Sequence, residues 1–159
     1  MDSTLSVTYK LNGKLVALAV EPLTTLRDAL REHLHYQATK AGCGQGGCGS
    51  CTVLVNDEPT LSCLLPLALA EGQSVTTLEG IGRPGHLHPL QQAFEEHFAA
   101  QCGYCTSGMI MAAKALLDQN PHPSRTEIAA GLCGNLCRCT GYQPIIEAVE
   151  DAAEQMRKL

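Results

Sequence analysis

Cysteine is the residue type through which this chain can do chemistry, and four of its nine cysteines form a first block. They stand as C-x-x-x-x-C-x-x-C with a fourth cysteine after eleven further residues, at Cys43, Cys48, Cys51 and Cys63. This is the plant-type spacing for the ligands of a 2Fe-2S cluster. Such a cluster is anionic, so we expect the glycines from Gly42 to Gly49 to let the backbone wrap closely and direct N–H groups at sulfur.

The same stretch contains Gly42, Gly44 and Gly47, which spell the G-x-G-x-x-G of dinucleotide-binding loops. That loop must leave a strand and open a helix whose N-terminus holds the pyrophosphate. Here the glycines follow a predicted helix and lead into a predicted strand. The order of elements therefore argues against nucleotide binding.

A second block has the spacing C-x-x-C, then 31 residues, then C-x-C, and its members are Cys102, Cys105, Cys137 and Cys139. Both pairs come just before predicted helices, whose N-termini would direct partial positive charge at an anionic cluster, and Arg138 could offset more of that charge. We favour a second iron-sulfur cluster. A closed zinc site with four cysteine ligands is the main alternative. A redox-active disulfide in the C-x-x-C is a third, although no βαβ unit surrounds it.

The other reactive side chains predict no catalysis by this chain. Cys133 lies outside both blocks, and we expect a small buried residue at the end of the third predicted helix. No histidine occupies a ligand position of either block, which argues against a Rieske-type cluster. His86 and His88 stand in a predicted loop, where we expect solvated side chains. We assign no general acid, base or nucleophile.

Residues 1–78 are predicted to form a small mixed sheet with one helix, which positions the first block. Apolar and polar residues alternate on both sides of Asn12-Gly13, which predicts a hairpin with a two-residue turn. Thr25 precedes a helix whose apolar face includes Leu26 and Leu30. Further strands are expected over 52–55, 61–65 and 75–78, with a turn at 56–59.

Residues 79–88 break every periodicity and are predicted to be a linker. Residues 89–159 then have four stretches of apolar residues at helical spacing, which predict four helices around the second block. The first stretch includes Leu90 and Phe98, the third helix begins at a capping box from Ser124 to Glu127, and the fourth begins at Pro144. The pattern predicts an α+β chain with two domains.

Composition limits the classes of function. The chain has 159 residues, 45% of them apolar, and a net charge of -5 without a basic patch, which argues against nucleic-acid binding. The longest apolar stretch, Cys63–Ala70, is far shorter than the roughly 20 residues that cross a bilayer. The first residues lack the pattern of a secretory signal, so we expect a cytoplasmic location unless a partner subunit carries an export signal.

Three strings in the two blocks resemble those of one family. K-A-G-C-G-Q-G-G-C-G-S-C at 40–51, Q-C-G-Y-C-T-S-G-M-I at 101–110 and G-N-L-C-R-C-T-G-Y at 134–142 are similar to the iron-sulfur subunit of molybdenum hydroxylases of the xanthine oxidase family. The resemblance implies an N-terminal ferredoxin-like β-grasp domain and a C-terminal four-helix domain, each with one 2Fe-2S cluster. It favours iron over zinc at the second block.

The resemblance also implies a role in electron transfer. In that family the substrate reacts at a molybdenum centre, bound by molybdopterin on a large subunit, and electrons pass through both clusters to FAD on a medium subunit. Gln101 and Cys139 match the positions that face the molybdopterin, while Gly44–Gly47 surround the cluster that faces the flavin. The chain would be a non-catalytic subunit of an oxidoreductase, in a heterotrimer that could itself dimerise.

One departure from the family pattern is Thr106-Ser107-Gly108, where relatives often have T-P-G. Serine is also acceptable at a helix start. Relatives that pass electrons to a cytochrome tend to have Gln at position 106, so Thr106 favours FAD as the acceptor. Two other functions stay open from the residues alone: a free-standing carrier with two clusters, and a zinc-stabilised interaction module.

Overall fold

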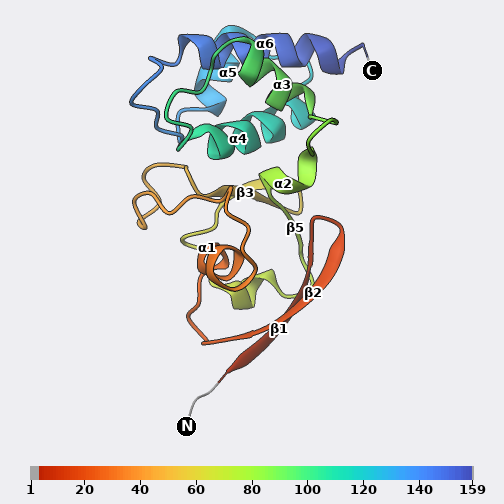
Figure 1. Cartoon of the computed structure of the whole chain (residues 1–159), viewed down its shortest axis with the longest axis vertical. Helices are drawn as coiled ribbons and strands as arrows, with labels where there is room; N and C mark the ends of the chain where they lie inside the picture. The colour runs from red at the N-terminus through yellow and green to blue at the C-terminus, as the bar shows by residue number, and fades with distance from the viewer. Residues whose placement is uncertain (1–3, 159) are drawn as a thin grey trace.

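The computed structural model describes residues 4–158, and its N-terminal half is built on one five-stranded sheet (Figure 1). The strand order is β2-β1-β5-β3-β4, with β1 and β5 parallel and the other neighbours antiparallel. The strands are β1 (Leu5–Leu11), β2 (Lys14–Val20), β3 (Thr52–Val55), β4 (Glu58–Leu61) and β5 (Ser74–Thr76). The mixed sheet, with helices following it, confirms the predicted α+β class.

Both hairpins of the sheet turn on two residues with positive φ. Asn12 and Gly13 (φ 49° and 79°) join β1 to β2 as predicted. The second hairpin differs from the prediction, because the turn is Asn56-Asp57 alone (φ 50° and 67°) and β4 begins at Glu58. Pro59 is compatible with a strand here because β4 is at the edge of the sheet, where a missing N–H breaks no ladder.

Two short helical segments contribute to the core of the sheet. One is the 3-10 helix η2 (Leu67–Ala70), whose Leu67 and Ala70 are fully buried, and the other begins after Thr25. Helix α1 (Leu26–Asp28) starts at Thr25, whose hydroxyl accepts a hydrogen bond from the Asp28 N–H at 3.2 Å, and it continues as a π-helical turn, η1 (Ala29–His33). Leu26 and Leu30 are fully buried. They pack with the inward residues of the sheet, which include Val7, Tyr9, Leu11, Val53 and Val75.

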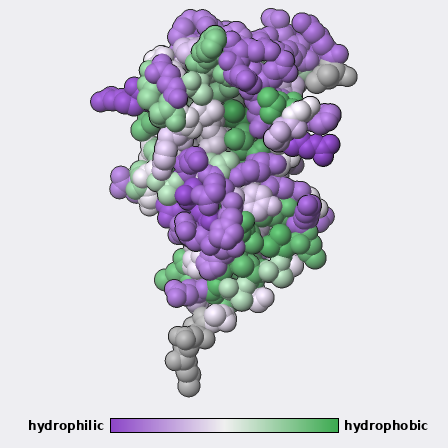
Figure 2. All heavy atoms as spheres, viewed as in Figure 1, coloured by the Kyte–Doolittle hydropathy of each residue, from purple (hydrophilic) through white to green (hydrophobic). Residues whose placement is uncertain are grey.

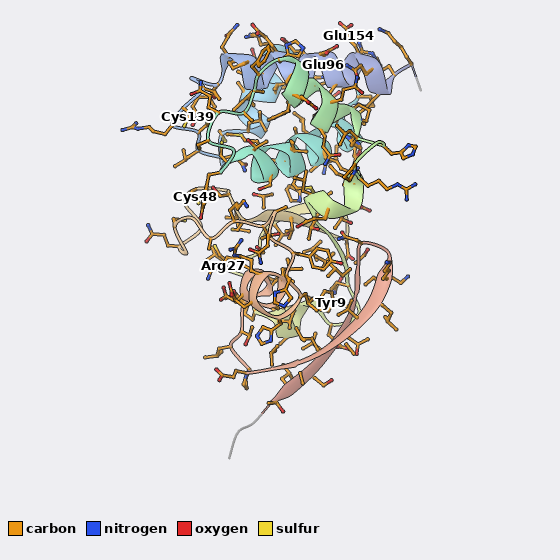
Figure 3. All side chains as sticks on the ribbon, viewed as in Figure 1. Tyr9, Arg27, Cys48, Glu96, Cys139 and Glu154 are labelled. Atoms are coloured by element: carbon orange, nitrogen blue, oxygen red, sulfur yellow. The ribbon has the colours of Figure 1, made fainter. Side chains whose placement is uncertain are left out.

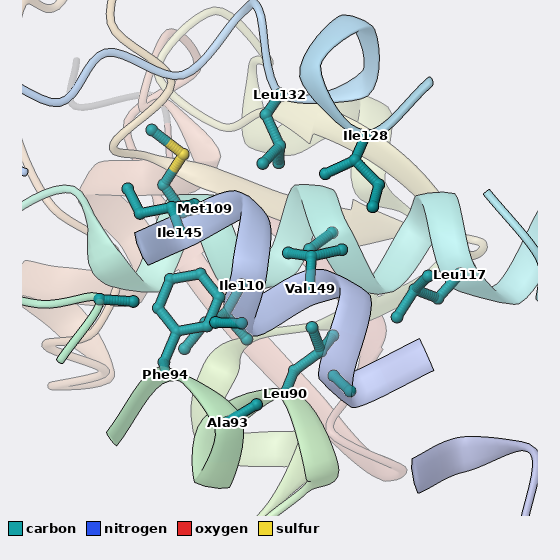
Figure 4. Close-up of a cluster of buried hydrophobic side chains, with 14 of the residues drawn as sticks. Leu90, Ala93, Phe94, Met109, Ile110, Leu117, Ile128, Leu132, Ile145 and Val149 are labelled. Carbon is teal, nitrogen blue, oxygen red and sulfur yellow. The ribbon is translucent and has the colours of Figure 1, made fainter. Parts of the chain in front are cut away.

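The C-terminal half is helical and has a separate core (Figure 4). The helices are α2 (Leu78–Ile81), α3 (Pro89–Glu96), α4 (Thr106–Gln119), α5 (Arg125–Gly131) and α6 (Gln143–Met156). Leu90, Met109, Ile128 and Val149, from four different helices, are inaccessible to solvent. The capping box at Ser124 and Glu127 is present as predicted, with the Ser124 hydroxyl accepting from the Glu127 N–H at 3.3 Å.

The two halves meet where α4 lies on β3. Leu54 of β3 packs against Met111 and Ala115 of α4, which are spaced one helical turn apart and are both buried. This contact forms a third, small hydrophobic cluster. It brings the start of α4, which follows the C-x-x-C pair of the second block, next to the loop of the first block.

Several local expectations were wrong. The last strand ends at Thr76 rather than residue 78, and Leu78 opens α2, which extends into the segment expected to be a linker. Phe98 does not join the core stripe of α3, because the helix ends at Glu96 and the ring is 83% exposed. His88 is not a free loop histidine: its Nδ1 accepts a hydrogen bond from the Leu90 N–H at 3.2 Å and caps α3.

In the part of the chain that the structure describes, no helix combines the length and the hydrophobicity that crossing a membrane would require.

Candidate iron-sulfur sites

The first cysteine block lies in a glycine-rich loop that points backbone N–H groups at sulfur. Gly44 and Gly46 have φ of 67° and 80°, a region in which glycine is unstrained. The loop directs the N–H groups of Gln45 and Gly47 at Cys43 Sγ, at 3.5 and 3.2 Å. The Gln45 N–H, together with the neighbouring Cys48 thiol, lowers the pKa of Cys43 to about 7. The loop thus stabilises a thiolate, as its glycines led us to expect.

The four thiols of this block form an outer and an inner pair. Cys43 lies beside Cys48, and both are at least partly exposed. Cys51 lies beside Cys63, and both are buried. Burial raises the pKa of Cys51, so a thiolate at this position needs a nearby positive charge.

Arg27 of α1 supplies part of that charge, although no pattern in the sequence pointed to it. Its guanidinium is bound to Asp28 at 2.7 Å and lies close enough to Cys51 and Cys63 for their charges to raise its own pKa further. A methyl group added at Gly44 would lie 3.7 Å from Arg27 Nη1. Arg27 belongs to none of the cysteine strings, so only the fold brings it to the loop.

The second block has the same arrangement of an outer and an inner pair. Cys102 and Cys139 are exposed, with their sulfurs 3.6 Å apart. Cys105 lies beside Cys137, and both are half-buried. Burial raises the pKa of Cys105 to about 12. Gln101 is exposed and directly precedes Cys102.

Hydrogen bonds hold Cys137 in place before the start of α6. Its N–H donates to the Tyr142 hydroxyl at 2.9 Å, and its sulfur lies 3.1 Å from Thr140 Oγ1. Burial acts to raise the pKa of Cys137, but the hydrogen bonds from Thr140 and neighbouring N–H groups outweigh it and lower the pKa. Tyr142 adopts a φ of 67° where its hydroxyl turns back to Cys137.

Figure 3 shows the two blocks on the same side of the molecule, with Cys139 above Cys48. Each block presents two pairs of thiols, and within residues 4–158 no three Cys, His, Asp or Glu side chains converge as the ligands of a single ion would. Two thiols per metal is the ligand count of each iron in a 2Fe-2S cluster that is held by four cysteines. The donor chemistry of both sites fits such a cluster.

Hydrogen bonds directly join the segments that carry the two cysteine blocks, and we call this contact the seam. The Leu136 N–H, next to Cys137, donates to the carbonyl of Cys48 at 3.0 Å. The buried Asn135 donates from Nδ2 to the Gly49 carbonyl at 3.0 Å, across 86 positions of sequence. Tyr104 donates from its hydroxyl to the Ala41 carbonyl at 2.8 Å. Segments that are distant in the chain are therefore adjacent at the point where one block meets the other.

Of two further residues singled out from the sequence, Cys133 differs in its surroundings from what we expected and Arg138 does not. Cys133 is exposed, which contradicts the prediction of a buried residue, because α5 ends at Gly131 and the chain turns outward after Leu132. Arg138 lies between Cys137 and Cys139 as expected, and within residues 4–158 its guanidinium forms no ion pair with a carboxylate. Its positive charge is therefore not neutralised by an acidic neighbour of this chain.

Comparison with family models divides the chain into two matches. Residues 9–77 match the 2Fe-2S iron-sulfur cluster binding domain, and residues 77–150 match the 2Fe-2S binding domain. The fold and the two cysteine blocks, with these matches, define a 2Fe-2S iron-sulfur-binding protein.

Similar proteins make the assignment more specific. A nicotinate dehydrogenase subunit of Pseudomonas putida is 48% identical over 158 residues, which cover 99% of both chains. The nicotinate dehydrogenase small FeS subunit of Eubacterium barkeri is 45% identical and covers 95% of this chain and 96% of its own. The structure of quinoline 2-oxidoreductase from Pseudomonas putida 86 superposes with a TM-score of 0.94 and 46% identity, over 98% of this chain and 97% of that one.

The chain belongs to the family of small iron-sulfur subunits of molybdenum hydroxylases, as its motifs indicated. It is therefore a non-catalytic subunit of an oxidoreductase.

Proposed function

We propose that this chain relays electrons between two partner subunits, a large one that carries a molybdopterin-bound molybdenum centre and a medium one that carries FAD. Two 2Fe-2S clusters would supply the redox chemistry, each passing single electrons. The ligands of the first cluster would be Cys43, Cys48, Cys51 and Cys63. Those of the second would be Cys102, Cys105, Cys137 and Cys139.

The paired arrangement of thiols at both sites supports these ligand sets. At each site one pair is more exposed than the other, so each cluster would have one iron nearer the surface and one nearer the protein interior. The exposed Cys102–Cys139 pair lies next to Gln101, which supports our assignment of Gln101 and Cys139 to the molybdopterin-facing side. The exposed Cys43 and the open glycine loop would face the flavin subunit.

The observation that carries the proposed relay is the seam between the blocks. The Cys48 carbonyl and the Leu136 N–H connect a ligand of one proposed cluster to the neighbour of a ligand of the other through a single hydrogen bond of 3.0 Å. Asn135 and Gly49 make a second bond beside it. A short path of covalent and hydrogen bonds between two redox centres favours electron transfer from one to the other.

Rapid mixing of substrate with the assembled complex tests the proposed order. A Cys63→Ser variant should lose only the first cluster, so that substrate still reduces the second cluster while FAD stays oxidised. Flavin reduction at the normal rate without the first cluster would contradict the order. A second cluster that stays oxidised while the molybdenum centre turns over would contradict it equally.

Two simple observations separate the alternatives. A zinc-stabilised module, without iron at either block, would be colourless, whereas a 2Fe-2S protein is red-brown. A free-standing carrier would purify alone, without molybdenum or flavin. The names of two relatives, which are subunits of nicotinate dehydrogenases, support the subunit over the free carrier.

A further inference from the structure

An apolar groove runs along the helical half, between α2, α3 and the start of α4. Two adjoining cavities of about 310 and 470 Å³ form it, and both are lined by Leu78, Leu87 and Gln91. The larger cavity extends to Phe98 and to Ala100, directly before Gln101. Figure 2 shows hydrophobic side chains among the hydrophilic helices of this half. The groove therefore reaches the residues next to the exposed Cys102–Cys139 pair.

Phe98 stands at the end of the groove in a conformation that is unfavourable for its residue type. Its φ is 52°, in the left-handed region that bulky residues rarely adopt. The following N–H, of Ala99, donates to the Phe94 carbonyl at 2.9 Å and fixes the turn. The ring is 83% exposed, so packing within the chain does not compensate for the strain. A left-handed residue is the usual way to end a helix, but glycine or asparagine normally occupies that position. The choice of an aromatic residue here, with its ring held in solvent, points to a function outside the chain.

The rim of the groove is acidic at the same end. Glu95 lines the larger cavity, and Glu95 and Glu96 occupy the last turn of α3, which contains no basic residue. The C-terminus of a helix carries partial negative charge, so carboxylates there are unfavourably placed in the isolated chain. Glu96 is partly compensated, because Gln92 Nε2 donates a hydrogen bond to it at 2.7 Å. Within residues 4–158 the Glu95 carboxylate has no ion-pair partner. A cationic side chain from outside would remove this conflict.

We infer that this groove binds the large, molybdopterin-carrying subunit, through an apolar segment of that subunit flanked by a lysine or arginine. The inference rests on the proposed function, which places that partner against Gln101 and Cys139, near the end of the groove. Phe98 is the anchor, because an aromatic side chain that becomes buried dominates the affinity of many interfaces. Glu95 pairs with the basic residue at the rim and steers association.

Site-specific crosslinking identifies what occupies the groove. The full chain is expressed with the subunits of its native complex and carries p-benzoyl-phenylalanine in place of Phe98 or, as a matched control, of Leu23. Leu23 is 86% exposed and lies in the sheet half, far along the chain from the groove. Illumination should link position 98 to the molybdenum-carrying subunit in much higher yield than position 23. A link from position 98 to the flavin subunit, or to a second copy of this chain, overturns the inference.

Competition between variant and wild-type chains for incorporation into the complex tests the proposed role of Phe98 as the anchor. When both are expressed with the partner subunits, Phe98→Gly should enter the complex about tenfold less than wild type. Its isolated chain should unfold at a higher temperature than wild type, because glycine removes the backbone strain. Poor folding of the variant therefore cannot produce the expected combination of lower incorporation and a higher unfolding temperature. Equal incorporation of Phe98→Gly and wild type overturns the inference.

Charge reversal tests the rim, and the wild-type complex separates the two proposals. Glu95→Lys should lower incorporation, most strongly at low salt, whereas Glu21→Lys, at another exposed carboxylate, should not. If the tagged wild-type chain purifies without any molybdenum-carrying subunit, the proposed function fails and the inference fails with it. If the wild-type complex forms and Phe98→Gly and Glu95→Lys enter it normally, only the groove assignment is wrong.

Discussion

At the scale of single residues, Gly108 decides how closely the two cysteine blocks approach. It lies in the first turn of α4, and a β-carbon built on it would lie 2.2 Å from the Gly49 carbonyl oxygen. Alanine is otherwise preferred over glycine inside a helix by about 1 kcal/mol. Whether a Gly→Ala substitution here raises or lowers the free energy of unfolding therefore tests whether the seam is as close as the structure shows.

Gly108→Ala should lower the free energy of unfolding by about 1 to 3 kcal/mol, because the methyl group must displace backbone at the seam. Gly134→Ala is the matched control, since a β-carbon there meets no atom within 4 Å, and it should change stability by less than about 0.5 kcal/mol. Chemical denaturation of both variants gives the comparison. Equal stability of the two would mean that the blocks are not in contact.

Cys133 provides a second prediction at this scale. Because it is exposed and outside both blocks, Cys133→Ala should keep both clusters and change the free energy of unfolding by less than about 0.5 kcal/mol. Cys137→Ala should lose the second cluster, because the remaining three thiols leave one iron with an incomplete set of ligands. EPR spectra of the reduced proteins check both. Loss of a signal in the Cys133 variant would show that the proposed ligand set is wrong.

At the scale of secondary-structure elements, the start of α3 depends on the protonation of His88. The ring accepts from the Leu90 N–H, which requires an unprotonated Nδ1, and the His88 N–H donates to Gln91 Oε1 at 2.9 Å. Burial and the charge of Lys114 lower the pKa of His88, while Asp118 acts in the opposite direction. The folded state therefore binds this proton less readily than the unfolded state.

The cap should contribute its full stability above the ordinary histidine pKa of about 6.5 and should lose it as the pH falls below that value. His88→Asn keeps an acceptor that does not titrate, so its stability relative to wild type should rise from pH 7.5 to 5.5. His88→Ala should cost about 1 kcal/mol at pH 7.5. Thermal denaturation across this range measures the difference. Parallel pH curves for wild type and His88→Asn would contradict the assigned role.

At the scale of the whole molecule, the two hydrophobic cores should make the two sites independent in assembly. One core surrounds α1 and the sheet, and the other lies among α3 to α6. We expect four iron and four acid-labile sulfide per chain, with two distinct EPR signals on reduction. Cys63→Ser should halve the iron and remove one signal only. Two iron per undamaged wild-type chain, or zinc at the second block, would contradict the prediction.

Periodicity and spacing in the sequence were sufficient to predict most of the helices and strands. The Asn12-Gly13 turn, the Ser124 cap and the helix that begins next to Pro144 follow from local preferences that few tertiary contacts oppose. The eight cysteines of the two blocks could be grouped into two proposed ligand sets because the spacing within each short cysteine string is a local property. The family resemblance also came from these strings, and the comparisons confirm it.

The tertiary structure alone decided which residues meet across the chain. Arg27 reaches the first cysteine block, and Asn135 binds the Gly49 carbonyl, through folding of segments that carry no common motif. Sequence periodicity placed Phe98 inside, and its residue type suggested that Cys133 is buried, but neither shows where a helix stops and the chain turns outward. Patterns of apolar residues show which face of a helix or strand is buried. Exposure at the end of a helix or strand depends on what the rest of the fold covers.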